Sequence, residues 1–428
     1  HADGGSAQPA DENAGDDRHF HFNQKQYFMG RFKLSTRVQH LNESATLRMA
    51  QMARELSNRQ IDVINLSLGE PDFDTPMHIK EKAKEAIDSG NTKYTPVAGT
   101  LALRQAISDK FKRDNQLNYS TDEIIVSNGA KQSFANLCNA MLDNPLDEVV
   151  LLAPYWVSYY EIIRLAGGTP IVVHSNVANN YKPRPEDLKA ALSANTRMLV
   201  FSSPCNPTGT LFNQQDCMEI ANLLKEYPDV LVVSDEIYEY IVFDQKHFSI
   251  GSIEGMNERT ATINGFSKGF SMTGWRLGYM GAPKEITQAC IRIQGQYTSG
   301  ASSFTQAAGA FALTSDLSIT RKMCEAFKSR RNTLIRELSR ITEWTINIPD
   351  GAFYLLPDVS KTFGKKHNGN TIYNSEDLAI YLLNEAHVAL VSGDAFGAPN
   401  CIRISYSLSE EKVIEAVQRI EAALQKLS

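Results

Sequence analysis

A lysine and an arginine stand eight residues apart in segment 264–279, which follows a short aliphatic run and is rich in glycine and hydroxyl side chains. A lysine on a loop is usually solvated. Here, Ser267 and Arg276 could both bind a phosphate while Lys268 faces the other end of the same ligand. The spacing therefore favours a phosphorylated ligand held beside a reactive amine.

A second group with chemical potential is Asp235, which directly follows the apolar run 231–233. A carboxylate left unpaired after a buried strand is costly. A helix N-cap would satisfy it, but a bound cation such as a protonated pyridine nitrogen would satisfy it better. Tyr238 adds a phenol three residues later, which favours the second interpretation.

Two further loops carry polar groups with less specific patterns. In 202–209 two prolines surround Asn206 and fix the direction of its amide, which could donate to a phenolate oxygen or simply complete a structural turn. In 127–131 Gly129 opens a helix start whose N–H groups suit a phosphate, or else provides a tight turn. Ligand groups in open α/β sheets lie beyond the carboxyl ends of the strands, so we expect these loops to meet.

The elements that must position these loops alternate between strand-like and helix-like from about residue 77 to 316. The short runs are aliphatic on both faces, as buried parallel strands are, and stretches 102–115 and 214–227 show helical spacing. This predicts an α/β fold with a mostly parallel seven-stranded sheet sandwiched by helices. The expected strands are 124–127, 149–153, 169–173, 198–202, 231–234, 261–264 and 277–282.

Beyond residue 318 the pattern changes to that of a smaller α+β domain, to which the helix and strand expected in 34–66 also belong. We expect a disordered leader or tag at 1–30, a joining segment at 31–75, a large ligand-binding domain at 76–317 and a small domain at 318–428. The helices expected in the small domain are 318–341, 376–385 and 409–427, and its strands are 345–348, 353–356, 388–390 and 402–405.

Composition narrows the function classes. A net charge of −6 argues against nucleic acid as a partner, and no apolar run approaches bilayer length, so no membrane partner is expected. The six cysteines form no CxxC pair and the nine histidines show no metal-ligand spacing. We therefore expect reduced thiols, a cytoplasmic location and no metal.

Eight motifs, in order and with similar gaps, resemble the class I aminotransferases of pyridoxal-phosphate (PLP) fold type I. The resemblance extends from about Leu34 to the end of the chain. It is carried by segments 68–76, 93–96, 154–156, 206–209, 235–238, 267–276, 351–354 and 402–405.

The resemblance implies pyridoxal 5′-phosphate as cofactor, with Lys268 as its Schiff-base lysine. It pairs Asp235 with the ring nitrogen, places Asn206 and Tyr238 on the 3′-oxygen, and stacks Trp156 on the ring. It also implies that Lys268, Asp235 and Tyr238 form the catalytic set. The residues implied around the phosphate are Gly129, Ala130, Lys131, Ser267, Arg276 and, in a homodimer with shared active sites, Tyr94 of the partner subunit.

For the substrate, the resemblance implies that Arg403 grips the α-carboxylate with help from Gly69, Asn206 and Trp156. Thr46 and Lys131 match a pair that meets the distal carboxylate of a dicarboxylic substrate in one branch of the family. That branch comprises the prokaryotic-type aspartate aminotransferases and the glutamate–prephenate aminotransferases. Lys131 could instead be a surface lysine on the first turn of a helix.

The expected reaction is transamination between a dicarboxylic amino acid, aspartate in the first place, and 2-oxoglutarate. The alternatives on the same fold are an aromatic, alanine-type or prephenate aminotransferase and a C–S lyase. A non-catalytic regulator is the alternative from another class, although Lys268, Asp235 and Arg403 together speak against it.

Overall fold

The computed structural model describes residues 32–39 and 41–428, and the expected leader lies outside this range. Residues 42–428 form one compact unit. The short helix α1 (Thr36–Gln39) belongs to a separate unit that ends at Leu41. None of the helices in the described residues is both long and apolar enough to cross a membrane.

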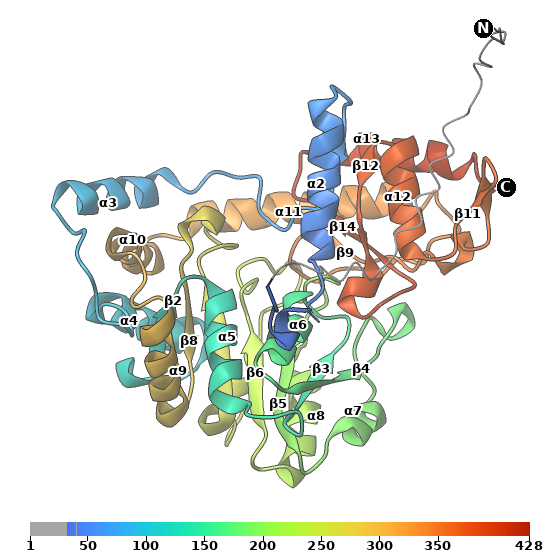
Figure 1. The fold of residues 1–428 in the computed structure, drawn as a ribbon. Helices are drawn as coiled ribbons and strands as arrows, with labels where there is room; N and C mark the ends of the chain where they lie inside the picture. Colours follow the sequence, from blue (N-terminus) through green and yellow to red (C-terminus); the bar gives the residue numbers. More distant parts are fainter. Residues whose placement is uncertain (1–31, 40) are drawn as a thin grey trace, which may run out of the picture. The chain divides into compact units, whose positions relative to one another are not determined.

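A seven-stranded sheet forms the centre of the larger part of the fold, with the strand order β2-β8-β7-β6-β5-β3-β4 (Figure 1). Only β8 runs antiparallel to its neighbours β2 and β7. The mostly parallel α/β sheet predicted from the sequence is therefore confirmed. The strands are β2 (Ile124–Ser127), β3 (Glu148–Leu152), β4 (Thr169–Val173), β5 (Thr196–Ser202), β6 (Leu231–Asp235), β7 (Thr260–Gly265) and β8 (Gly278–Gly281).

Helices cover both faces of this sheet because its strands are apolar on both. Val149 and Leu151 of β3 pack in one core with helices α5 (Ala130–Met141), α6 (Ser158–Leu165) and α9 (Lys284–Tyr297). Val150 and Leu152 face the opposite core, with α7 (Pro185–Ala191) and α8 (Gln214–Leu223). Alternate side chains of one strand thus enter two cores, as a strand period of two requires.

At the β2 edge of the sheet a third core is formed by helices that precede and follow the strands in the chain. The helix expected at 102–115 consists of α4 (Leu101–Lys110), continued by one wider helical turn over Phe111–Asn115. It packs with α3 (Met77–Asp88) and α10 (Ser303–Thr314). Val126, just before Gly129, and Leu277, just after Arg276, are part of this core.

The C-terminal residues form a further core around the three-stranded sheet β13-β14-β9, which comprises Val391–Ser392, Ile402–Ser405 and Tyr354–Leu355. Three helices pack on it: α11 (Ser318–Leu338), α12 (Ser375–Glu385) and α13 (Glu410–Leu424). Helix α2 (Ala45–Asn58) and strand β1 (Ile64–Asn65) join the same core, and β1 pairs in parallel with β12 (Val388–Ala389). The division of the chain into domains at residue 318 stays a prediction.

The strand expected at 345–348 is wrong. Only Thr345 makes an isolated bridge, to Asp358, and Ile348 is largely exposed. Asn347 donates its side-chain amide to the Thr208 carbonyl at 2.8 Å, and Pro349 has no N–H for a ladder. The segment is therefore fixed to a loop by a side chain instead of to a strand by its backbone.

Candidate active site

The loops that carry the expected ligand-binding residues leave the sheet at one edge. Strands β2, β3, β5, β6 and β7 share one direction, because β8 is antiparallel to both β2 and β7 and the other pairs are parallel. Their carboxyl ends therefore lie at the same edge, where ligands bind in folds of this class. The residues placed just beyond these ends are Gly129, Trp156, Asn206, Asp235 with Tyr238, and Ser267 with Lys268.

Lys268 follows β7, and its ammonium group contacts two of the expected residues, Gly69 and Tyr238. Nζ donates a hydrogen bond to the carbonyl of Gly69 and lies 5.8 Å from the ring centroid of Tyr238. Burial lowers the pKa of Lys268 to about 8, with the charges of Arg403 and Arg276 acting in the same direction. About a tenth of this amine is therefore unprotonated at pH 7, far more than of an ordinary lysine, which suits a nucleophile.

Asp235 ends β6 with its side chain buried. Its carboxylate accepts a hydrogen bond from the Tyr159 hydroxyl and another from the backbone N–H of Ile237 at 3.1 Å. The segment that follows is a turn, so Asp235 is not a helix N-cap. Burial raises its pKa to about 6. A cation beside this carboxylate would lower that pKa again, which is what a protonated ring nitrogen would do.

Arg403 on β14 is 2% exposed and has no carboxylate partner among the described residues. Its Nη1 donates to Oδ1 of Asn206 at 3.1 Å, its Nη2 to the Ser67 carbonyl at 2.6 Å, and its buried Nε has no partner in the described chain. A buried guanidinium without a counter-charge is costly. The site therefore fits a ligand that brings its own carboxylate.

The start of α5 and Arg276 form the second anion-binding feature. Gly129 precedes α5 with φ 85°, and a Cβ at this position would lie 2.5 Å from Nη2 of Arg276. A Cβ on Gly278 would lie 2.3 Å from the backbone nitrogen of Ala130. The glycines thus let a guanidinium and the free N–H groups of a helix start come together. This cradle fits a phosphate group.

Lys131 and Trp156 contact each other at this edge, with Nζ 4.9 Å from the indole ring centroid. Burial, together with the charge of Arg276, lowers the pKa of Lys131. The lysine is exposed by area, yet it lies near Arg276 and carries no carboxylate partner in the described chain. The interpretation of Lys131 as an ordinary surface lysine is weakened by these contacts.

Within the described residues, Thr46 and Tyr94 are among the expected residues that no hydrogen bond, ion pair or ring contact joins to the others. Thr46 lies in the first turn of α2 and is partly buried. The side chain of Tyr94 is fully exposed.

Sequence reasoning assigned no role to Tyr159 or Tyr354, which contact predicted site residues directly. Tyr159 bonds Asp235, and the hydroxyl of Tyr354 lies 2.9 Å from that of Tyr238. Tyr159 follows Trp156 by three residues at the start of a helix, a spacing that is typical of core packing. Tyr354 lies in a motif that carries the family resemblance, which was the only signal available for it.

A group of possible metal ligands begins one residue after Asp235 and comprises Glu236, Glu239 and His247. Its centre is already filled by other side chains. Asn115 donates to Glu236 at 3.1 Å and to Glu239 at 2.8 Å, while Lys110 forms an ion pair with Glu239. The cluster is thus a buried network of charges and hydrogen bonds that holds the chain next to Asp235.

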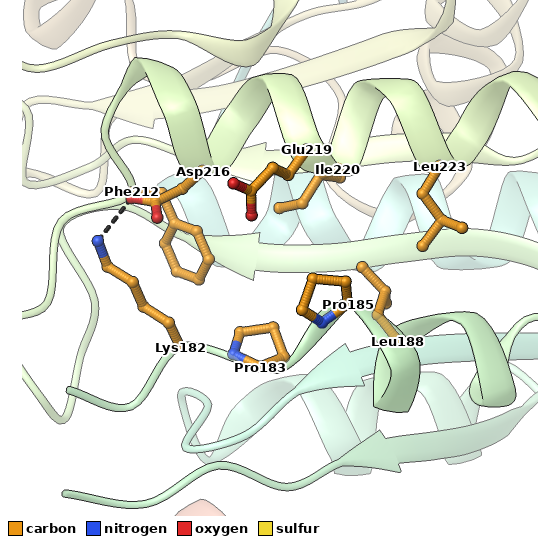
Figure 2. A pocket seen from close by; sticks show the side chains of 9 residues that line it. All are labelled: Lys182, Pro183, Pro185, Leu188, Phe212, Asp216, Glu219, Ile220 and Leu223. Carbon is orange, nitrogen blue, oxygen red and sulfur yellow. Dashed lines mark hydrogen bonds and ion pairs between the residues drawn. The ribbon is translucent and has the colours of Figure 1, made fainter. Parts of the chain in front are cut away.

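A hollow elsewhere on the molecule lies between α7 and α8 and contains none of the predicted site residues (Figure 2). Its wall is largely apolar, and a 2.5 Å ion pair between Lys182 and Asp216 stands at one end. It offers no convergent polar groups comparable to those around Lys268. The residues that line it are Lys182, Pro183, Pro185, Leu188, Phe212, Asp216, Glu219, Ile220 and Leu223.

Comparison with known proteins agrees with the fold. Residues 61–420 match the family described as aminotransferase class I and II. The chain therefore belongs to this family. It is an aminotransferase of fold type I, and its family implies pyridoxal phosphate as cofactor.

Similar proteins come from plants and bacteria. The chain is 45% identical over 396 residues to a bifunctional aspartate aminotransferase and glutamate/aspartate-prephenate aminotransferase of Petunia hybrida, covering 91% of this chain and 82% of that protein. It is 44% identical to a probable aspartate/prephenate aminotransferase of Rickettsia felis, covering 92% and 97%. The crystal structure of the aspartate aminotransferase from Rhizobium meliloti superposes with a TM-score of 0.90 at 38% identity, covering 93% of this chain and 100% of that one.

Proposed function

We propose that the chain transfers an amino group between a dicarboxylic amino acid, aspartate in the first place, and 2-oxoglutarate. The observation that carries this proposal is the buried Arg403 guanidinium, which lacks a carboxylate partner in the described residues and stands in the same site as Lys268. Relatives named as aspartate aminotransferases support the choice of amino acid.

The cofactor would be held by side chains that the sheet edge brings together. Lys268 would bind it covalently through Nζ, Asp235 would face its ring nitrogen, and Trp156 would cover the ring. Asn206 and Tyr238 would contact the 3′-oxygen. Asn206 accepts from Arg403 through Oδ1, and its Nδ2 has no partner in the described chain, so the amide is free to donate.

The phosphate would lie in the cradle at the start of α5. Its negative charge would offset those of Arg276 and Lys131, neither of which forms an ion pair with a carboxylate of the described residues. The proposed phosphate-binding residues are Gly129, Ala130, Lys131, Ser267, Arg276 and Tyr94 of the partner subunit.

When bound, pyridoxal phosphate supplies an electron-withdrawing ring that makes the Cα–H of an attached amino acid acidic. The chain then has to move one proton and hold the substrate still. Once the substrate amine has taken its place on the cofactor, the freed Nζ of Lys268, whose pKa is lowered to about 8, would take the proton from Cα and deliver it to the cofactor carbon on the other side of the substrate nitrogen. Asp235 would keep the ring nitrogen protonated, and Arg403 would hold the α-carboxylate so that the Cα–H bond faces Lys268.

Selection of a dicarboxylic substrate is proposed to rest on Thr46 and Lys131. Lys131 has contacts that support this role, since its Nζ lies over Trp156 and near the charge of Arg276. Prephenate is a second candidate amino acceptor. It is favoured by relatives such as the aspartate/prephenate aminotransferase of Nitrosomonas europaea, which is 41% identical.

A half-reaction titration tests the proposed function. The purified protein, loaded with pyridoxal phosphate, is mixed with single amino acids while the absorbance of the cofactor is followed. Aspartate and glutamate should convert it to the pyridoxamine form and release the corresponding 2-oxo acids, while alanine and phenylalanine should be slower. A sulfur-containing amino acid such as cystathionine is included in the panel, and its conversion to a thiol, pyruvate and ammonia without a 2-oxo acid acceptor would instead identify a C–S lyase.

We also infer a homodimer with shared sites and a cytoplasmic location. Full exposure of Tyr94 in the single chain supports the first, because a phosphate ligand is not expected to be left in solvent. All six cysteines are free, which supports the second. Mixing Tyr94→Ala and Lys268→Ala subunits tests the dimer: a shared site should regain activity in one of the two sites of each hybrid, whereas separate sites should not.

A further inference from the structure

A buried phenol on β9 lies where the proposed cofactor-binding and substrate-binding groups meet. Tyr354 is 0% exposed. Its hydroxyl lies 2.9 Å from the hydroxyl of Tyr238, and the guanidinium carbon of Arg403 lies 4.7 Å from its ring centroid. A Cβ added to Gly69 would lie 3.0 Å from the same hydroxyl. One side chain therefore contacts three residues of the site.

The backbone explains why Tyr354 reaches Arg403. Tyr354 on β9 pairs directly with Ser405 on β14, and Arg403 is two residues before Ser405. Residues two apart on a strand share a face, so Arg403 is the diagonal neighbour of Tyr354. A guanidinium over a tyrosine ring is attracted to its electron-rich face. The ladder thus fixes the ring as a support for Arg403.

The number of available protons determines the direction of the hydrogen bond between Tyr354 and Tyr238. Each phenol has one proton to donate, and within the described residues the only hydrogen bond of either hydroxyl is the one to the other. If Tyr238 donates its proton to the 3′-oxygen of the cofactor, the 2.9 Å contact survives only when Tyr354 donates to Tyr238. Burial raises the pKa of Tyr354, so the proton needed for this is retained.

We propose that Tyr354 is a positioning residue, which donates a hydrogen bond to Tyr238 when Tyr238 binds the cofactor and which supports the Arg403 guanidinium with its ring. This inference rests on the proposed function. The hydroxyl and the ring act on different ligands. The hydroxyl makes Tyr238 a stronger donor to the 3′-oxygen, and the ring keeps Arg403 in place for the carboxylate.

Two substitutions separate these effects in the loaded full-length protein. Tyr354→Phe removes only the hydroxyl, and Tyr354→Leu removes the ring as well. The pH midpoint of the absorbance of bound pyridoxal phosphate reports the 3′-oxygen. The dissociation constant of maleate, an unreactive dicarboxylate, reports Arg403. Neither readout depends on turnover.

Without the hydroxyl, the ionised 3′-oxygen is less well stabilised, so Tyr354→Phe should raise the pH midpoint by about 0.5–1 unit. Its affinity for maleate should stay within about twofold of the wild type, since the ring remains. Tyr354→Leu should show the same rise and weaken maleate binding about five- to tenfold. Added to Tyr238→Phe, the Tyr354→Phe change should shift the midpoint no further.

Tyr381→Phe is the matched control. Tyr381 is a buried phenol of the same core, and its hydroxyl donates to the Ala423 carbonyl at 2.7 Å, so its loss should leave both readouts unchanged. An unchanged midpoint in Tyr354→Phe or in Tyr354→Leu overturns the inference, as does a shift that adds to that of Tyr238→Phe. A wild-type protein that neither binds pyridoxal phosphate nor transfers amino groups overturns the proposed function instead.

Discussion

The Tyr159 hydroxyl donates a hydrogen bond to the buried carboxylate of Asp235, and both side chains belong to the same face of the sheet. Tyr159 lies in the first helix after β3, whereas Asp235 ends β6. The bond therefore joins a helix to the end of a strand and orients the one carboxylate that is proposed to face the ring nitrogen. Burial of Tyr159 excludes water as a substitute donor.

Tyr159→Phe should weaken cofactor binding without breaking the fold. The change removes one donor from Asp235, so the pKa of this carboxyl should rise further above about 6 and its pairing with the ring nitrogen should weaken. We expect the dissociation constant for pyridoxal phosphate to increase about three- to tenfold, measured by fluorescence quenching.

The matched control is Tyr119→Phe, another buried phenol, whose hydroxyl donates to the Thr260 carbonyl at 3.0 Å. Tyr119→Phe should lower the free energy of unfolding about as much as Tyr159→Phe does, and it should leave the affinity for pyridoxal phosphate unchanged. Equal affinities in the two variants would mean that the bond to Asp235 serves packing alone.

Capture of the cofactor by the apoprotein should depend on pH through Lys268. Only the unprotonated amine attacks an aldehyde, and the pKa of Lys268 is lowered to about 8 by burial. Below pH 8 the rate should rise about tenfold per pH unit, and above it the rate should level off. Stopped-flow absorbance measures this rate, and a single rise centred near pH 10.5 would contradict the lowered pKa.

The same shift has a consequence for stability. The folded-state pKa of Lys268 lies below its ordinary value of 10.5, so between about pH 8 and 10.5 the unfolded chain binds more protons than the folded one. The contribution of this group to the free energy of unfolding should therefore increase with pH in that interval. Lys268→Met should remove this slope in chemical unfolding of the apoprotein, with Lys182→Met, at the hollow between α7 and α8, as control.

Sequence reasoning found the sheet because each strand is an aliphatic run bounded by polar residues. All seven expected strands were confirmed with small shifts, such as β5 starting at Thr196 where 198 was expected. It failed at 345–348, where an equally strand-like pattern is overridden by the Asn347 side chain and by Pro349. No property of the sequence reveals that a side-chain amide will bond the carbonyl of Thr208.

Among the site residues, too, some could be predicted from the sequence pattern and others could not. Lys268, Asp235 and Asn206 stand directly after strand-like runs, so the topology alone brings them to one edge. Tyr159 and Tyr354 act through contacts between segments that are far apart in the chain, and their residue types are equally suited to core packing. Such contacts become visible only when the register of strands and helices is known.

Arg403→Met should stabilise the protein in the absence of ligands while abolishing substrate binding. The guanidinium is buried without a carboxylate partner in the described chain, so an apolar side chain of similar length removes a desolvation cost. We expect an increase of about 1–3 kcal/mol in the free energy of unfolding and a rise in Tm. Affinity for maleate should fall by about 30-fold or more.

Arg331→Met gives the comparison for that prediction. Arg331 is also buried, but it pairs with Asp244 at 3.0 Å and donates to the Pro349 carbonyl at 2.9 Å. Its removal should therefore lower Tm and leave maleate binding intact. A lower free energy of unfolding in both variants would show that contacts within the folded chain stabilise the Arg403 guanidinium without a bound anion.

Lys131→Ala should separate dicarboxylic from monocarboxylic substrates. If the lysine meets the distal carboxylate, its loss removes an interaction that aspartate makes and alanine cannot. The KM for aspartate should rise about tenfold or more, whereas kcat/KM for alanine should change less than about twofold. Steady-state kinetics with both amino acids measure the difference. Equal effects on the two substrates would indicate that Lys131 acts at the phosphate, next to Arg276. An unchanged KM for both would indicate a surface lysine that only packs on Trp156.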